Sequence, residues 1–179
     1  LGSNEEKLAA VSSILNRIKF SPPELRNRQV AAILEAAACG PLPTDIMLTS
    51  KQVKELADRG VEIGGHTQAH TILTTLDDEH ALEEIANGKR QLELITGEPV
   101  TSFAYPNGKP GRDYAEHHVP LVKAAGFARA VSTTFGVGTR HTDVFQLPRF
   151  TPWGVSSVAW SMQLLRNIVS SSSSVARTY

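Results

Sequence analysis

The residues from Gly64 to His70 read Gly-Gly-His-Thr-Gln-Ala-His and form the strongest chemical pattern in the chain. His66 and His70 are four residues apart, so their side chains share one face if the turn between them is helical. Neutral imidazole nitrogens bind zinc and related divalent ions. We therefore interpret the pair as part of a metal site. The alternative is structural: one histidine ends a strand and the other lies on a solvated helix.

The elements that must position this pair alternate along the chain. The pattern predicts strands at 61–65, 100–104, 128–132 and 145–150, and helices at 49–60, 78–95, 114–125 and 157–169. Such alternation indicates a parallel sheet of the α/β class, with functional residues at the carboxyl ends of its strands. Four strands are fewer than the roughly eight of a closed, side-chain-filled barrel. A small open sheet and the later part of a (β/α) barrel both remain open.

The remaining segments define the domain organisation. Residues 1–42 are expected to be a helical insertion or preceding helices, with capping boxes at Ser3 and at Ser21. Residues 43–169 would form the partial barrel, and the Ser-rich tail at 170–179 is expected to be frayed.

The composition excludes several classes of protein. Eighteen Lys and Arg residues balance eighteen Asp and Glu residues, which argues against nucleic acid and anionic membranes as partners. Cys39 is the single cysteine, so an internal disulfide and a cysteine-based zinc cluster are excluded. No apolar run approaches the ~18–20 residues of a membrane span. We therefore expect a soluble protein.

Several motifs in order resemble the polysaccharide deacetylases, also known as NodB-homology domains or carbohydrate esterase family four. The histidine motif is similar to that family's H-(S/T)-x-x-H metal motif. Residues 103–108, Phe-Ala-Tyr-Pro-Asn-Gly, are similar to its third motif, and 124–127 and 147–150 resemble later elements. The resemblance runs from residue 43 to residue 153.

The resemblance implies an irregular (β/α) barrel that removes N- or O-acetyl groups from an acetylated polysaccharide or oligosaccharide. It implies a divalent metal, with zinc expected, held by an aspartate and two histidines, and a second aspartate as the base. His66 and His70 match the metal positions. Asn107 matches the residue whose backbone N–H helps to hold the oxyanion, and Tyr105 and Pro106 would shape the substrate loop.

The sequence also departs from the family pattern. No Asp-Asp pair precedes His66, and Asp77-Asp78 is expected to start a helix instead. Ala104 stands where the family has an arginine that orients the base, and Arg149 is the candidate to replace it. The family's late histidine has no clear match, because His117 and His118 are expected to be exposed on a helix.

We therefore expect the carboxyl-terminal portion of a deacetylase-like barrel, inactive alone, whose amino-terminal segment supplies the Asp-Asp pair. One alternative is a non-catalytic glycan-binding domain. Another is an unrelated metal hydrolase, with a third ligand among Asp45, Asp113 and Asp143. The sequence does not define the compartment, but the resemblance suggests a bacterial protein associated with the cell envelope.

Overall fold

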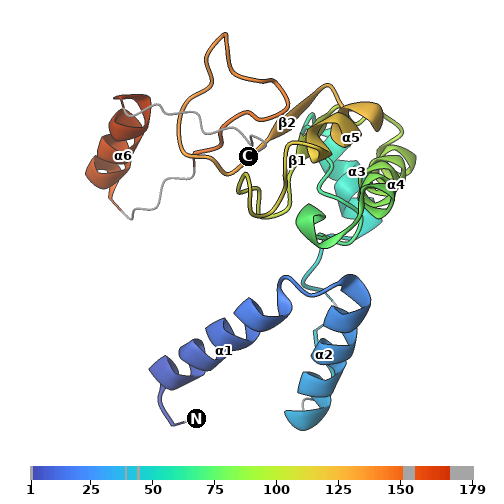
Figure 1. Cartoon of the computed structure of the whole chain (residues 1–179), viewed down its shortest axis with the longest axis vertical. Helices are drawn as coiled ribbons and strands as arrows, with labels where there is room; N and C mark the ends of the chain where they lie inside the picture. Colours follow the sequence, from blue (N-terminus) through green and yellow to red (C-terminus); the bar gives the residue numbers. More distant parts are fainter. Residues whose placement is uncertain (1, 39, 44, 151–155, 170–179) are drawn as a thin grey trace. The chain divides into compact units, whose positions relative to one another are not determined.

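A computed structural model describes residues 2–38, 40–43, 45–150 and 156–169 of the 179-residue chain. The chain divides into two compact units, Leu1–Met47 and Leu48–Tyr179 (Figure 1). The predicted tail at 170–179 lies outside the described residues.

The first unit contains the two predicted helices, α1 (Asn4–Ile18) and α2 (Pro23–Ala36). The capping box at the start of α1 is confirmed. The Ser3 hydroxyl accepts a hydrogen bond from the Glu6 N–H at 3.2 Å, and the Glu6 carboxylate accepts one from the Ser3 N–H at 3.1 Å.

The cap predicted for α2 is wrong. Pro22 is the N-cap residue, the helix begins at Pro23, and no side chain caps it. Proline disfavours the helical conformation in the residue before it, so the two consecutive prolines move the start of the helix along the chain. The Ser21 hydroxyl donates instead to Gln29 Oε1 at 3.0 Å.

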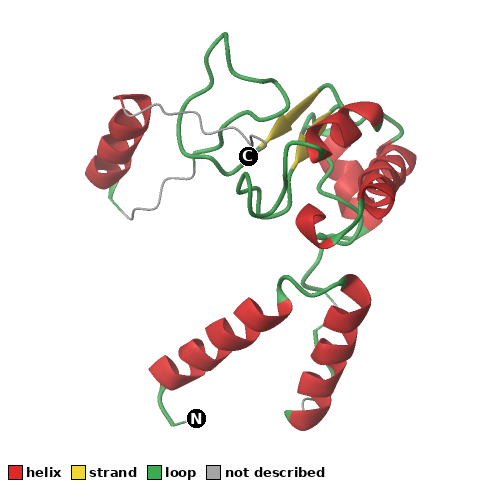
Figure 2. Ribbon diagram, viewed as in Figure 1, coloured by secondary structure: helices red, strands yellow, loops and turns green. Residues whose placement is uncertain are grey.

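The second unit combines helices with a short parallel sheet (Figures 1 and 2). Its elements are α3 (Ser50–Asp58), η1 (Leu73–Thr75), α4 (Asp78–Thr96), β1 (Ser102–Ala104), α5 (His118–Ala124), β2 (Arg129–Val131) and α6 (Ser157–Val169). The pair Asp77-Asp78 starts α4 as expected, because the Asp77 carboxylate accepts a hydrogen bond from the His80 N–H at 2.9 Å. Among the described helices, none has both the length and the apolar character needed to cross a bilayer.

The sheet is parallel as predicted, but its strands are shorter. β1 pairs with β2, while the predicted outer strands contribute only single bridges, from Gly65 to β1 and from Leu147 to β2. Glycine weakens a strand and proline removes an N–H donor, so Gly64-Gly65 and Pro148 limit both outer segments. Within the described residues, segment 61–65 pairs with β1 and with no strand on its other side.

The core lies on one side of β1. Phe103 is buried there with Ile85 of α4, Val122 of α5 and Phe127. Alternate residues of a strand point to opposite faces, and the two residues that flank Phe103 are only half-buried. One face of β1 therefore belongs to the core, and the other is left partly open.

Two stacked tyrosines connect the loops that follow the strands. The rings of Tyr105 and Tyr114 are 3.8 Å apart and inclined by 7°. The Tyr105 hydroxyl donates to the Phe145 carbonyl at 3.1 Å, and the Tyr114 hydroxyl donates to Gln146 Oε1 at 3.1 Å. Burial raises the pKa of Tyr105 well above its ordinary value. Tyr105 is therefore a core residue that supports the loop between β1 and α5.

We predict that Tyr105→Phe lowers the free energy of unfolding by about 1–2 kcal/mol, because the Phe145 carbonyl loses its buried donor. Urea denaturation of the wild type and the variant measures the difference. Equal stability of the two proteins would mean that this hydroxyl has no structural role.

Candidate metal site

The two histidines of the sequence motif meet beyond the end of the outer strand segment. Their ring centroids are 4.7 Å apart, with the planes inclined by 76°. They do not meet on one face of a helical turn, because residues 66–70 form a loop in which Thr67 and His70 have φ values of 59° and 53°. The imidazoles are thus brought together by two left-handed backbone positions.

His66 is oriented by the sheet. Its Nδ1 lies 2.7 Å from the Ala104 carbonyl, which can only accept, so Nδ1 carries the proton in the neutral ring. Nε2 then keeps its lone pair, as in metal-binding histidines whose other nitrogen donates to a carbonyl. Burial lowers the pKa of His66 and outweighs the hydrogen bond to Ala104, which raises it, while nearby His70 and Arg149 act in the same direction as burial. The neutral ring fits the role of a metal ligand.

A cavity of about 440 Å³ opens beside His66. Its walls include Ser102 and Ala104 from the open face of β1, Glu62 from the preceding segment, and Arg149. The structure thus brings Arg149 and His66 to one cavity, although the two residues are far apart in the sequence. The side chain of Glu62 binds both Ser102 and Arg129, and these hydrogen bonds hold the pKa of Glu62 below its ordinary value.

The loop that carries Asn107 is tightly packed. Tyr105 and Pro106 are fully buried, so both side chains contribute to the shape of the loop and not to its surface. Asn107 and Gly108 have φ values of 56° and 73°, and a Cβ at Gly108 would lie 3.0 Å from both the Thr133 nitrogen and the Tyr105 oxygen. Within the described part of the chain, the Asn107 N–H has no hydrogen-bond acceptor. No hydrogen bond of the described residues therefore occupies this donor.

The described residues do not complete a ligand set around the histidine pair. Among them, no group of three His, Cys, Asp or Glu residues with ligand atoms all within 4.8 Å of one another includes His66 and His70. The Asp113 carboxylate accepts the Lys109 N–H at 2.9 Å, and the Asp143 carboxylate accepts the Phe145 N–H at 2.9 Å. Both carboxylates therefore have local structural roles. Asp45 lies in the first unit.

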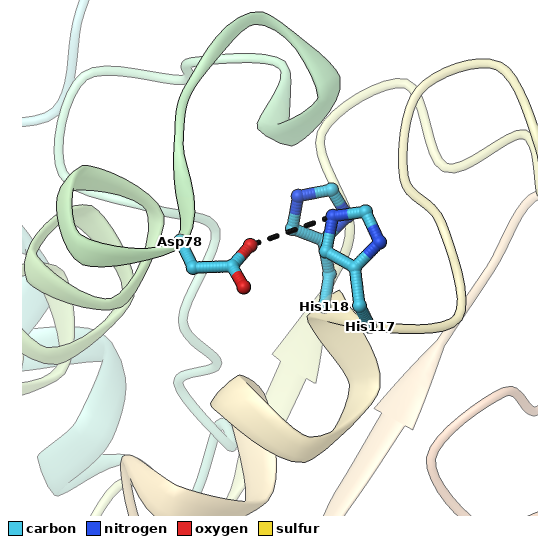
Figure 3. A group of neighbouring side chains, drawn as sticks. All are labelled: Asp78, His117 and His118. Carbon is cyan, nitrogen blue, oxygen red and sulfur yellow. Dashed lines mark ion pairs between the residues drawn. The ribbon is translucent and has the colours of Figure 1, made fainter.

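A second group of potential ligands lies between α4 and α5. Asp78, His117 and His118 place one ligand atom each within 4.8 Å of one another (Figure 3). His117 Nε2 is 3.5 Å from the Asp78 carboxylate. The expectation that both histidines are exposed is wrong for His118, which retains 1% of its accessible surface.

The tautomer of His118 is unsuited to metal binding. Its Nδ1 accepts a hydrogen bond from the Ala115 N–H at 2.9 Å, so Nε2 must carry the proton when the ring is neutral. Coordination through Nε2 would require the opposite tautomer, and coordination through Nδ1 would displace the Ala115 N–H. Of the two groups, the pair His66 and His70 therefore fits a metal better.

Comparison with known proteins agrees with the motifs. The family model for polysaccharide deacetylases matches residues 28–130, which is more than half of the chain. The match begins within α2 and ends at β2, so it includes both histidines and Asn107. The fold and this match define a deacetylase-type α/β domain. The chain belongs to the polysaccharide deacetylase family.

Individual relatives are longer than this chain. YxkH of Bacillus subtilis (strain 168), which carries the name of a polysaccharide deacetylase, is 28% identical over 102 residues, or 57% of this chain and 35% of YxkH. The Streptococcus pyogenes deacetylase PplD, solved in complex with acetate, is similar in fold at a TM-score of 0.61, with 22% identity and coverage of 70% of this chain and 52% of PplD. For BA0330 of Bacillus anthracis, named as a polysaccharide deacetylase, the TM-score is 0.58, with 22% identity and coverage of 80% and 48%.

His118 should make stability depend on pH. Burial lowers the pKa of folded His118 to about 4 from an ordinary value of 6.5. As the pH falls, the unfolded chain therefore takes up the proton first. His118 should thus contribute fully to stability above pH 6.5 and progressively less toward pH 4, by at most about 3 kcal/mol.

Urea denaturation between pH 4 and pH 8 tests this dependence. His118→Asn keeps an acceptor for the Ala115 N–H but cannot titrate, so it should flatten the pH profile relative to the wild type. His141→Asn, at an exposed histidine whose charge does not act on His118, should keep the wild-type profile. Parallel profiles for the wild type and His118→Asn would contradict the assignment.

Proposed function

We propose that this chain forms the metal-binding part of a hydrolase that removes acetyl groups from an acetylated polysaccharide or oligosaccharide. The observation that carries the proposal is the Nδ1 contact of His66 with the Ala104 carbonyl, because it leaves Nε2 available beside His70. Membership of the deacetylase family supports the substrate class. Acetate, the bound molecule in the PplD structure, is the product that such a reaction releases.

His66 and His70 would hold the divalent ion, and zinc suits their imidazole nitrogens. A divalent metal supplies Lewis acidity, which polarises a carbonyl and lowers the pKa of water. The Asn107 N–H would donate to the oxygen that becomes negative, a role that depends on backbone geometry. Tyr105 and Pro106 would hold the Asn107 loop in shape from the core.

Ala104 stands at the position where the family has an arginine, and Arg149 would take over the role of that arginine. Both residues line the cavity beside His66, and the small Ala104 side chain leaves room there for a guanidinium group from another strand end. A guanidinium forms two-pronged hydrogen bonds with a carboxylate, so Arg149 is suited to orient an aspartate base.

The third ligand and the base would come from a segment that completes the barrel. The unpaired side of segment 61–65 offers a place for a further strand, and an exposed edge is a liability that folded proteins cover or pair. The longer relatives support this proposal, since the chain spans 35% of YxkH and 52% of PplD. An acetylated polymer substrate would place the protein at the bacterial cell envelope.

A non-catalytic glycan-binding domain is the second candidate. It is favoured by one observation, the lack of a third ligand beside His66 and His70 among the described residues. Acetate release by a protein that includes the completing segment would exclude it.

Metal binding should require His66 and His70. In zinc titrations of chelator-free protein, we expect His66→Ala/His70→Ala to weaken binding by at least about tenfold, consistent with the loss of both direct ligands. Asp78→Asn/His117→Ala, which removes two members of the other group, should bind like the wild type. The reverse ranking of the two double variants would move the metal to the group between α4 and α5.

Activity should require the completing segment. General-base catalysis contributes about 10²–10⁴-fold, so the 179-residue chain should release acetate from an acetylated chitooligosaccharide no faster than His66→Ala/His70→Ala. Adding an upstream segment with an Asp-Asp strand should raise metal affinity and acetate release together. Metal-dependent turnover by the 179 residues alone would show that this chain supplies its own base.

A further inference from the structure

The loop between the two histidines is attached to α4 by a single carboxylate. Oε2 of Glu84 accepts the N–H of Gln68 at 3.1 Å and the N–H of Ala69 at 2.9 Å. Hydrogen bonds to an ionised acceptor are about twice as strong as neutral ones. Glu84 therefore holds the two residues at the centre of the His66–His70 loop.

This loop needs an external support. Thr67 and His70 both have positive φ, which costs of order one to a few kcal/mol for residues other than glycine and persists only where the surroundings enforce it. Inside the loop, the Thr67 hydroxyl donates to the His66 carbonyl at 2.7 Å and accepts the Thr71 N–H at 3.0 Å. The two N–H groups at the centre of the loop, those of Gln68 and Ala69, have their acceptor outside the loop, in Glu84.

Gly88 lies one helical turn after Glu84 and brings α4 close to the same loop. A Cβ at Gly88 would lie 2.8 Å from the carbonyl carbon and oxygen of Thr67 and 3.0 Å from the Gln68 nitrogen. Residues four apart share one face of a helix. One face of α4 thus supplies both a carboxylate that holds the loop and a gap that admits its backbone.

We propose that Glu84 and Gly88 are positioning residues for the metal site. Together they fix the loop in the conformation that sets the 4.7 Å spacing of the His66 and His70 rings. The inference rests on the proposed metal-binding function, although the loop itself can be tested without metal. It predicts that variants in α4 change metal affinity without removing a ligand.

The test compares Glu84→Ala and Glu84→Gln with Glu83→Gln, which alters the exposed neighbouring glutamate. In metal-free protein, amide hydrogen exchange at Gln68 and Ala69 should accelerate at least tenfold in Glu84→Ala, less in Glu84→Gln, and not in Glu83→Gln. In zinc titrations, the Kd should rise in the same order, by about 10–100-fold for Glu84→Ala, as for other residues that orient metal ligands. The visible spectrum of bound Co²⁺ should change in the Glu84 variants and not in Glu83→Gln.

Gly88→Ala provides an independent variant. Alanine is the stronger helix former, but its Cβ must displace the Thr67 backbone, so zinc affinity should fall about tenfold while Glu84 remains. Wild-type affinity and an unchanged Co²⁺ spectrum in both Glu84→Ala and Gly88→Ala would overturn the inference while leaving the metal site intact. If His66→Ala/His70→Ala instead binds zinc as tightly as the wild type, the proposed function is overturned, and the metal-positioning role with it.

Discussion

The hydrogen bond between His66 Nδ1 and the Ala104 carbonyl is the contact on which the candidate site depends. Ala104 also donates its N–H to the Gly65 carbonyl at 2.8 Å, so one residue of β1 fixes both the register of segment 61–65 and the tautomer of His66. A shift of one residue between segment 61–65 and β1 would turn the neighbouring side chain toward the cavity in place of His66. His66 Nδ1 would then lose the Ala104 carbonyl as its acceptor. Pairing of the sheet and orientation of the candidate metal ligand are therefore a single structural event.

The two groups of imidazoles show how backbone partners determine the chemistry of a histidine. Nδ1 of His66 contacts a carbonyl, so Nε2 of this ring keeps its lone pair. Nδ1 of His118 contacts an amide N–H, so Nε2 of this ring carries the proton. His118 is buried and His66 is half-buried, and burial lowers both pKa values. Proximity of three ligand-type residues is therefore a weaker criterion than the polarity of the groups that the rings already contact.

The sequence predicted what local patterns encode. The capping box of α1, the start of α4 at Asp78 and the parallel order of the sheet all follow from short-range signals. The contacts of His66, Glu84 and Gly88 with distant segments could not be predicted, because they depend on how β1 and α4 pack against one loop. The sequence offered one signal for the contact of α4 with the loop. Glu84 and Gly88 are four residues apart in a helix that closely follows the histidine motif, so they share one face of that helix.

The alternation of side chains along β1 then explains why the candidate site lies where it does. Phe103 turns toward α4 and anchors the core, so its neighbours Ser102 and Ala104 must face the other way. Both neighbours are small, and the space that they leave is part of the cavity that His66 and Arg149 also line. Larger residues at these two positions would fill the cavity without disturbing the core. The division of β1 into a packing face and an open face therefore lets one three-residue strand stabilise the domain and shape the site.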